Sequence, residues 1–169
     1  MGDKLKQSGI VRKIDDLGRI VLPKELRQTL NLSAGDDFEI LIEGDNIVLK
    51  KFSRLTTLSE SLQNLINIFT KHINFNIFIT TNNKLINHNN EDILPDISKL
   101  IKERKTYLNE HANQIKISKT LVVDGKLIIL PIIINSDLLG SIIAFGKEDI
   151  KNMNNILNIL LSLIKTQFT

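Results

Sequence analysis

The sequence predicts an α+β protein with a small β-rich amino-terminal domain and a larger domain whose helices flank a central antiparallel sheet. Three observations support this prediction. Short strand patterns separated by glycine-containing turns fill residues 9–51 and enclose one short helix pattern. Apolar residues at alternating spacings of three and four follow at 55–69 and return at 150–164. Several strand patterns lie between these two helices.

The composition narrows the class of protein. The 169 residues include no cysteine, which excludes disulfides, thiolate metal sites and cysteine nucleophiles. The most apolar runs, 127–134 and 156–164, are much shorter than the roughly 20 residues that a membrane helix needs. The sequence has no apolar signal segment at its amino terminus. We therefore expect a cytoplasmic protein without a membrane partner.

A basic hairpin is the most distinctive feature of the amino-terminal domain. Residues 9–14 and 19–22 are strand candidates around the turn Asp15-Asp-Leu-Gly18, where glycine supplies a positive φ. Pro23 suits the first position of a short helix, and we expect Leu22, Leu26 and Leu30 to form its buried stripe. Five cations lie within sixteen positions, namely Arg12, Lys13, Arg19, Lys24 and Arg27. They suggest a DNA-binding surface, and an ordinary solvated surface is the alternative that the residues alone leave open. Residues 1–8 are expected to form a flexible basic arm.

A second hairpin completes this domain. Phe38, Ile40 and Ile42 alternate with other residues, which predicts a strand with one buried face, and residues 47–51 form the returning strand. The domain has strands of only four to six residues and a single phenylalanine, so one copy buries little apolar area. Isolated hairpins are marginally stable in water, and dimerisation is the expected solution.

The carboxy-terminal domain is expected at 58–169, after a linker at 53–57. Two apolar stripes are typical of helices that pack on other helices, namely Leu55, Leu58, Leu62, Leu65 and Phe69, and Ile150, Met153, Leu157, Leu160 and Ile164. One stripe can cover a sheet while the other meets a partner subunit; alternatively both pack on their own domain. Strands are predicted at 75–80, 114–118, 127–134 and 138–145, with a helix near 97–104.

The amino-terminal motifs resemble a known family. Gly9-Ile-Val-Arg-Lys, Asp15-Asp-Leu-Gly-Arg-Ile-Val and Pro23-Lys-Glu-Leu-Arg stand where the AbrB family of bacterial transition-state regulators has them. The segment from Gly9 to Phe52 therefore resembles the swapped-hairpin DNA-binding domain of that family. The strand, turn and strand from Pro131 through Gly140 resemble part of a GAF domain. This order of domains is similar to that of regulators of late sporulation genes in spore-forming bacteria.

The resemblance implies a DNA-binding transcriptional regulator, activator or repressor, acting on the nucleoid at AT-rich or bendable promoter DNA. It implies a homodimer whose hairpins interleave into one β-barrel and a homotetramer through the helices of the GAF-like domain. It also implies that double-stranded DNA contacts Arg12, Lys13, Arg19, Lys24 and Arg27. Many family members have a second arginine where this chain has Gln28, which brings no charge.

Three other functions are weighed against this one. An enzyme is not expected, because His72, His88 and His111 are scattered and no phosphate-binding loop or nucleophile motif is present. An antitoxin would share the hairpin domain, but its tail is usually short and disordered. A metabolite sensor would bind a small molecule in the GAF-like domain, near His88, Asn89, Tyr107 or His111. No cofactor motif occurs, so no cofactor is expected.

Overall fold

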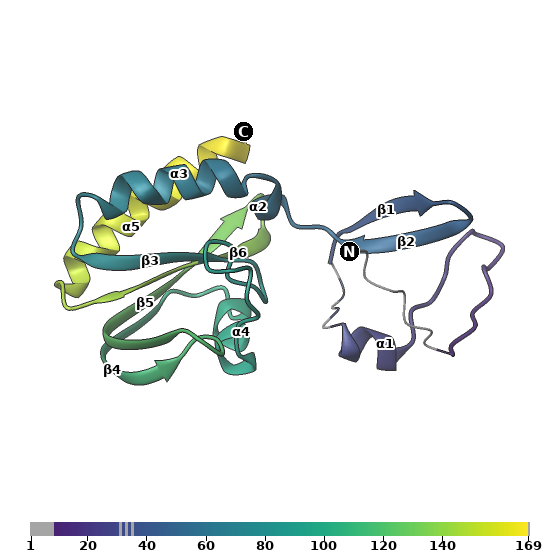
Figure 1. The fold of residues 1–169 in the computed structure, drawn as a ribbon, viewed down its shortest axis with the longest axis horizontal. Helices are drawn as coiled ribbons and strands as arrows, with labels where there is room; N and C mark the ends of the chain where they lie inside the picture. Colours follow the sequence, from purple (N-terminus) through teal and green to yellow (C-terminus); the bar gives the residue numbers. More distant parts are fainter. Residues whose placement is uncertain (1–8, 31, 33, 35, 169) are drawn as a thin grey trace. The chain divides into compact units, whose positions relative to one another are not determined.

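The computed structural model describes residues 9–30, 32, 34 and 36–168, and the expected arm at 1–8 lies outside this range. The chain divides into two compact units, the first ending at Lys51 and the second beginning at Phe52. Both are visible in Figure 1. Within the described residues, no helix is long and apolar enough to span a membrane.

The first unit contains one short helix and one hairpin. Helix α1 covers Lys24–Thr29 and begins directly after Pro23. Strands β1, Phe38–Glu43, and β2, Asn46–Lys51, pair antiparallel around the predicted turn. The register places Ile40 opposite Leu49 and Ile42 opposite Ile47, so these four side chains share one face of the hairpin.

Two predictions for this unit are wrong for a single chain. Residues 9–14 and 19–22 form no strands, although the turn between them is present. The face expected to be buried is open, with Ile40 68% and Ile42 80% exposed. The helix stripe is only half realised, because Leu22 and Leu26 are half-buried and Leu30 is exposed. The common reason is that the described residues of one copy of this unit do not cover these side chains.

The second unit is a four-stranded antiparallel sheet between helices. Its sheet order is β3-β6-β5-β4. Helices α3 and α5 lie side by side over one face, while α4 lies on the other (Figure 1). The elements in chain order are α2 Arg54–Thr57, α3 Ser59–Thr70, β3 Phe75–Thr80, α4 Pro95–Lys102, β4 Tyr107–Lys116, β5 Val122–Ile134, β6 Asp137–Gly146, α5 Ile150–Lys165 and the 3-10 helix Thr166–Phe168.

The segment expected to be a linker belongs to this unit. Residues 54–57 form helix α2, and Leu55 is completely buried in the core. It packs close to Gly140 in β6, where an added Cβ would lie 2.9 Å from its Cδ1 and 1.8 Å from the carbonyl oxygen of Thr80. Gly140 thus permits a close approach that any side chain would prevent.

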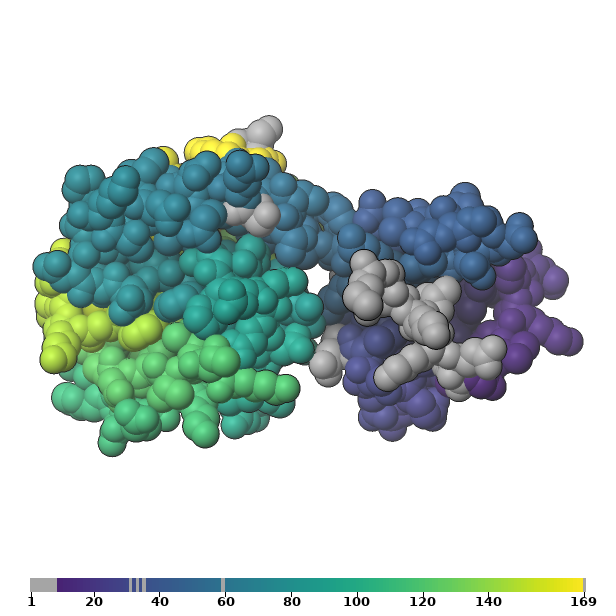
Figure 2. Space-filling model, viewed as in Figure 1, coloured from purple at the N-terminus to yellow at the C-terminus, as the bar shows by residue number. Residues whose placement is uncertain are grey.

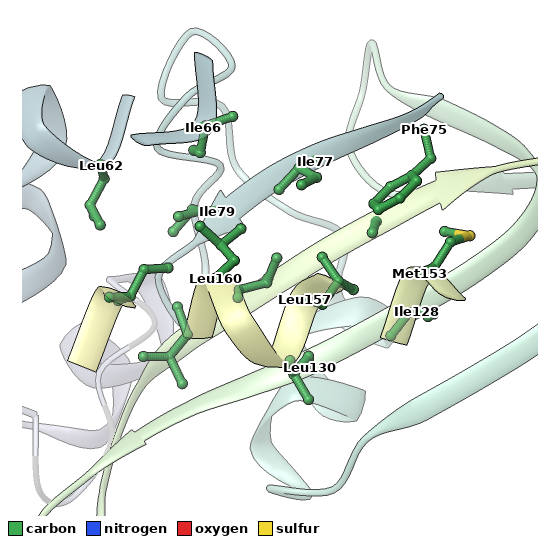
Figure 3. Packing of buried hydrophobic residues seen from close by; sticks show 14 of the residues in the cluster. Leu62, Ile66, Phe75, Ile77, Ile79, Ile128, Leu130, Met153, Leu157 and Leu160 are labelled. Carbon is green, nitrogen blue, oxygen red and sulfur yellow. The ribbon is translucent and has the colours of Figure 1, made fainter. Parts of the chain in front are cut away.

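Both faces of the sheet are covered, which explains its sequence. The larger core joins the sheet to α2, α3 and α5 (Figure 3). A second core joins the other face to α4, β4 and the loop that carries Leu85. Strands β5 and β6 therefore read as nearly continuous apolar runs rather than alternating ones. The outer edge of β3 is partly covered by Asn87, whose side-chain amide accepts from Ile79 N and donates to Ile77 O.

The two predicted apolar stripes serve their own domain. All five residues of the α5 stripe are buried, and those of the first helical segment are buried or packed against the same core. The stripes are therefore not available to a partner subunit. The large apolar side chains that α3 and α5 leave exposed are Ile68, Ile159 and Leu163. The remaining differences are at boundaries: β4 begins at Tyr107 rather than near 114, so Tyr107 and His111 lie in a strand.

Candidate nucleic-acid interface

The turn of the basic hairpin is closed by one aspartate. Asp15 Oδ1 accepts from the backbone N–H of Leu17 at 3.0 Å and of Arg19 at 2.8 Å. Its Oδ2 accepts from Arg19 Nε at 2.8 Å. The backbone adds bonds from Asp15 N to Arg19 O and from Gly18 N to Asp15 O. Gly18 takes φ +74°, the left-handed conformation that favours glycine.

These bonds also set the electrostatics of the turn. The backbone N–H and then the guanidinium of Arg19 are the main reasons that the pKa of Asp15 is lowered from 3.8. Because the carboxylate holds Nε, the two terminal nitrogens of Arg19 remain for another acceptor. The Arg19 side chain is 69% exposed, so that acceptor can approach from solvent.

The predicted contact residues are all on the surface. Arg12 and Lys13 precede the turn, Arg19 follows it, and Lys24 and Arg27 lie three positions apart on one side of α1. All five are exposed, as is Gln28. Among the described residues, the pair with Asp15 is the one ion pair that these cations form. The purple segment that carries the hairpin lies at the edge of the first unit in Figure 2.

Asp15, Asp16 and Glu25 lie among the cations, whereas the other acids of the unit, at 36–45, are separated from them in sequence. Asp36 pairs with Lys51 at 2.8 Å, with 11% of the Asp36 side chain exposed. This pair fastens the segment before β1 to the end of β2. The described cations at positions 12–27 therefore stand apart from the acids at 36–45 along the chain.

Apolar side chains are exposed between the cations. Val11, Leu17 and Val21 are 74% to 85% exposed, and Ile14 and Ile20 at least 50%. Exposed apolar residues occurring singly need no explanation, but a contiguous set marks an interaction site. The open face of β1 and β2 is a second exposed apolar set in the same unit.

A polar cluster in the second unit was missed by sequence reasoning. Glu91 accepts from Ser118 Oγ at 2.6 Å, from Thr120 Oγ1 at 2.7 Å and from Thr120 N at 3.1 Å. The hydroxyl of Ser118, then that of Thr120, lower the pKa of Glu91. His88 Nε2 lies 3.1 Å from Thr120 Oγ1, and its ring meets Phe78 edge to face. The cluster ties two loops together, and no motif spacing could reveal it because its members lie about thirty positions apart in the sequence.

The other residues considered for a ligand lie elsewhere. Asn89 is exposed with φ +52°, and Tyr107 and His111 are in β4. Among the described residues, His88 makes its hydrogen bond with Thr120 and its ring contact with Phe78. Neither contact involves Asn89, Tyr107 or His111. A metal site is likewise not formed by the described histidines and carboxylates.

Comparison with known proteins defines the class of the first unit. Residues 11–54 match the family model described as antidote-toxin recognition MazE, bacterial antitoxin. Residues 11–54 therefore form a domain of the MazE/AbrB type, which confirms the family expected from the motifs. The second unit, a four-stranded antiparallel sheet with helices, has the arrangement expected of a GAF-like domain.

Individual relatives extend the comparison. Stage V sporulation protein T of Bacillus subtilis (strain 168) is 28% identical over 154 residues, which cover 85% of this chain and 86% of that protein. The transition state regulatory protein AbrB of the same organism is 50% identical over 48 residues, covering 28% of this chain and half of that protein. The solution structure of the N-domain of the transcription factor AbrB is 49% identical and covers 29% of this chain and 94% of that one, with a TM-score of 0.27.

Proposed function

We propose that this protein is a DNA-binding transcriptional regulator that grips duplex DNA through paired basic hairpins. The observation that carries the proposal is the set of five exposed cations around a turn closed by Asp15, in a domain shared with a transition state regulator. The relative that spans both units is named for sporulation, which supports late-sporulation genes as the targets. Such a regulator works in the cytoplasm, on the nucleoid.

The DNA-binding form is a homodimer with interleaved hairpins. Residues 11–14 and 19–21, on either side of the Asp15 turn, are assigned to no strand, and their apolar side chains are exposed. A second copy presents the same exposed apolar side chains and the same open face of β1 and β2. Pairing two copies would give these segments neighbouring strands, cover the open face, and close a barrel without free edges.

Binding of this kind depends strongly on salt. Lysine and arginine contacts to phosphates release counterions and fix register, while arginines at base edges add preference. The only described helix of the first unit is six residues long. We therefore propose selection of AT-rich or bendable sites through DNA shape. Gln28 contributes a hydrogen bond at most, without charge.

We further propose that dimers join into a homotetramer through α3 and α5. These helices lie side by side on one face of the sheet and expose Ile68, Ile159 and Leu163 (Figure 1). From Asn152 to Ile164, α5 has no charged residue, so removing water from its outer surface costs little free energy. A tetramer with two DNA-binding ends gains avidity. Light scattering at micromolar concentration tests it, and a strict dimer refutes the tetramer.

The test of DNA binding uses Arg12→Ala and Arg19→Ala. Each should weaken binding to promoter DNA and reduce the slope of log K against log salt by about 0.9 for each phosphate that the variant no longer neutralises, hence about 1.8 for a dimer. Lys50→Ala removes an exposed cation from β2 in the same unit and serves as the control. Equal salt slopes for both arginine variants, the control and the wild type would exclude this surface as the DNA contact.

The family description favours an antitoxin as the second candidate. The two closed cores of the second unit argue against a tail that folds only on a toxin. Co-expression with small proteins encoded beside the gene separates the candidates: neutralisation of a toxic product without promoter binding supports the antitoxin. A metabolite sensor remains the third candidate, with a small molecule near His88, and thermal shifts of the second unit across metabolite classes test it.

A further inference from the structure

Seven residues of the second unit carry as much net positive charge as the whole chain. Residues 99–105 contain four cations, Lys99, Lys102, Arg104 and Lys105, and one acid, Glu103. Their net charge of +3 equals that of the whole chain, because the other 18 cations are matched by 18 acids. We call residues 99–105 the α4 basic patch. It lies at the end of α4 and in the turn that leads to β4.

The charges of this patch are free to meet a partner. All residues of the patch except Leu100 and Ile101 are exposed. Within the part of the chain that the structure describes, none of its four cations forms an ion pair with a carboxylate. Cations near the end of a helix also stabilise its dipole, and Lys99 and Lys102 do so here. Arg104 and Lys105 lie beyond the helix and need another explanation.

Arg104 has an unusual backbone. Its φ is +58°, the left-handed region in which a helix normally ends with glycine or asparagine. Its Nη1 donates to the carbonyl oxygen of Ser136 at 2.9 Å, in the turn between β5 and β6. One donor of the guanidinium is thus used to hold the side chain, and the remaining donors are left for another acceptor.

We propose that the α4 basic patch is a second phosphate contact, through which the GAF-like domain holds DNA flanking the site bound by the hairpins. This rests on the proposed DNA-binding function. Unpaired lysines and an anchored arginine are the groups that bind phosphates. The patch exposes no large apolar side chain, which disfavours a membrane surface or a protein hot spot.

The position of the patch in the second unit permits this role. The patch belongs to the face of the sheet opposite α3 and α5, so a tetramer formed through those helices leaves it open (Figure 1). Once the hairpins hold DNA, neighbouring phosphates are present at high effective concentration, and weak contacts then add to affinity. The patch should therefore act on long DNA and have little effect on a fragment that covers only the hairpin site.

The experiment compares Lys99→Gln/Lys102→Gln/Lys105→Gln with Lys116→Gln/Lys147→Gln/Lys165→Gln in the full chain. Both variants remove three exposed lysines of the second unit, so their net charges are equal. Binding is measured on a wild-type footprint alone and on the same footprint with flanks of about two helical turns. We expect the patch variant to bind flanked DNA about tenfold more weakly, with a salt slope shallower by about 0.9 for each phosphate that it no longer neutralises. On the bare footprint it should bind like the control.

Two results would overturn the proposal. Equal decreases in affinity for both triple variants would indicate a general charge effect, and an unchanged patch variant on flanked DNA would show that the patch does not contact DNA. Failure of the wild type to bind any promoter DNA would instead refute the proposed function. Circular dichroism and thermal melting check the fold, and Lys105→Gln alone, outside the helix, should show a smaller decrease in the same direction.

Discussion

Substitution of Ile42 by aspartate should dissociate the proposed dimer. Ile42 is 80% exposed in a single chain and shares its face with Ile40, Ile47 and Leu49. Burying a whole isoleucine side chain contributes about 1.5–3 kcal/mol, so covering this one contributes about 1–2.5 kcal/mol per chain. The contact occurs twice in a symmetric dimer, which gives about 2–5 kcal/mol. Dimer Kd should therefore rise from about 30-fold to several thousand-fold.

Sedimentation equilibrium over a wide concentration range measures this change. Asn46→Asp is the matched control, because it adds a carboxylate to the opposite face of the same hairpin. It should leave dimer Kd within about a factor of three of the wild type. DNA binding should disappear together with the dimer in Ile42→Asp. If that variant keeps the wild-type mass at every concentration, the open face of β1 and β2 is not the dimer interface.

Three further predictions concern the stability of each unit. Gly140→Ala puts a methyl group 1.8 Å from a carbonyl oxygen of β3, so calorimetry should show the second unit destabilised by at least about 1–3 kcal/mol. Leu157→Ala removes a completely buried side chain and should cost about 2–5 kcal/mol in urea unfolding, whereas Leu108→Ala, on β4 and 53% exposed, should cost far less; equal destabilisation would contradict the packing described. Because the folded state lowers the pKa of Asp15, its carboxylate stabilises the folded turn above pH 3.8, and this stabilisation is lost as the pH falls through the lowered folded value. Asp15→Asn should therefore differ from the wild type in NMR hydrogen exchange of the turn at neutral pH and converge with it in acid.

The candidate DNA surface was largely predictable because its elements are local. The turn residues, the proline before α1 and the cations lie within one short segment, so their order along the chain already places them together. Even there, the hydrogen bonds that Arg19 donates to the Asp15 carboxylate are visible only in the three-dimensional structure. The expected strands at 9–14 and 19–22 are not formed among the described residues, because strand pairing depends on contacts outside the local segment.

The polar cluster of the second unit was not predictable. Glu91 reaches Ser118 and Thr120 across about thirty positions, and none of these residue types at that spacing belongs to a motif. The linker assignment failed for a related reason. The five residues of the expected linker, 53–57, include Leu55, which also begins the predicted apolar stripe. Leu55 is buried in the core beside Gly140, where the glycine leaves room for it.

The sequence by itself determined the β1–β2 hairpin, the helices α1, α3, α4 and α5, the buried stripes of α3 and α5, and which family the first domain resembles. These follow from period, turn chemistry and short motifs, all of which act over a few residues. Only the tertiary structure decided what each apolar face packs against. Both helical stripes pack on the sheet of their own unit, whereas the face of β1 and β2 that carries Ile40 and Ile42 is exposed. Periodicity predicts that one face of a helix or strand is buried. Which surface covers that face depends on contacts with residues far away in the chain or on a second copy of the chain.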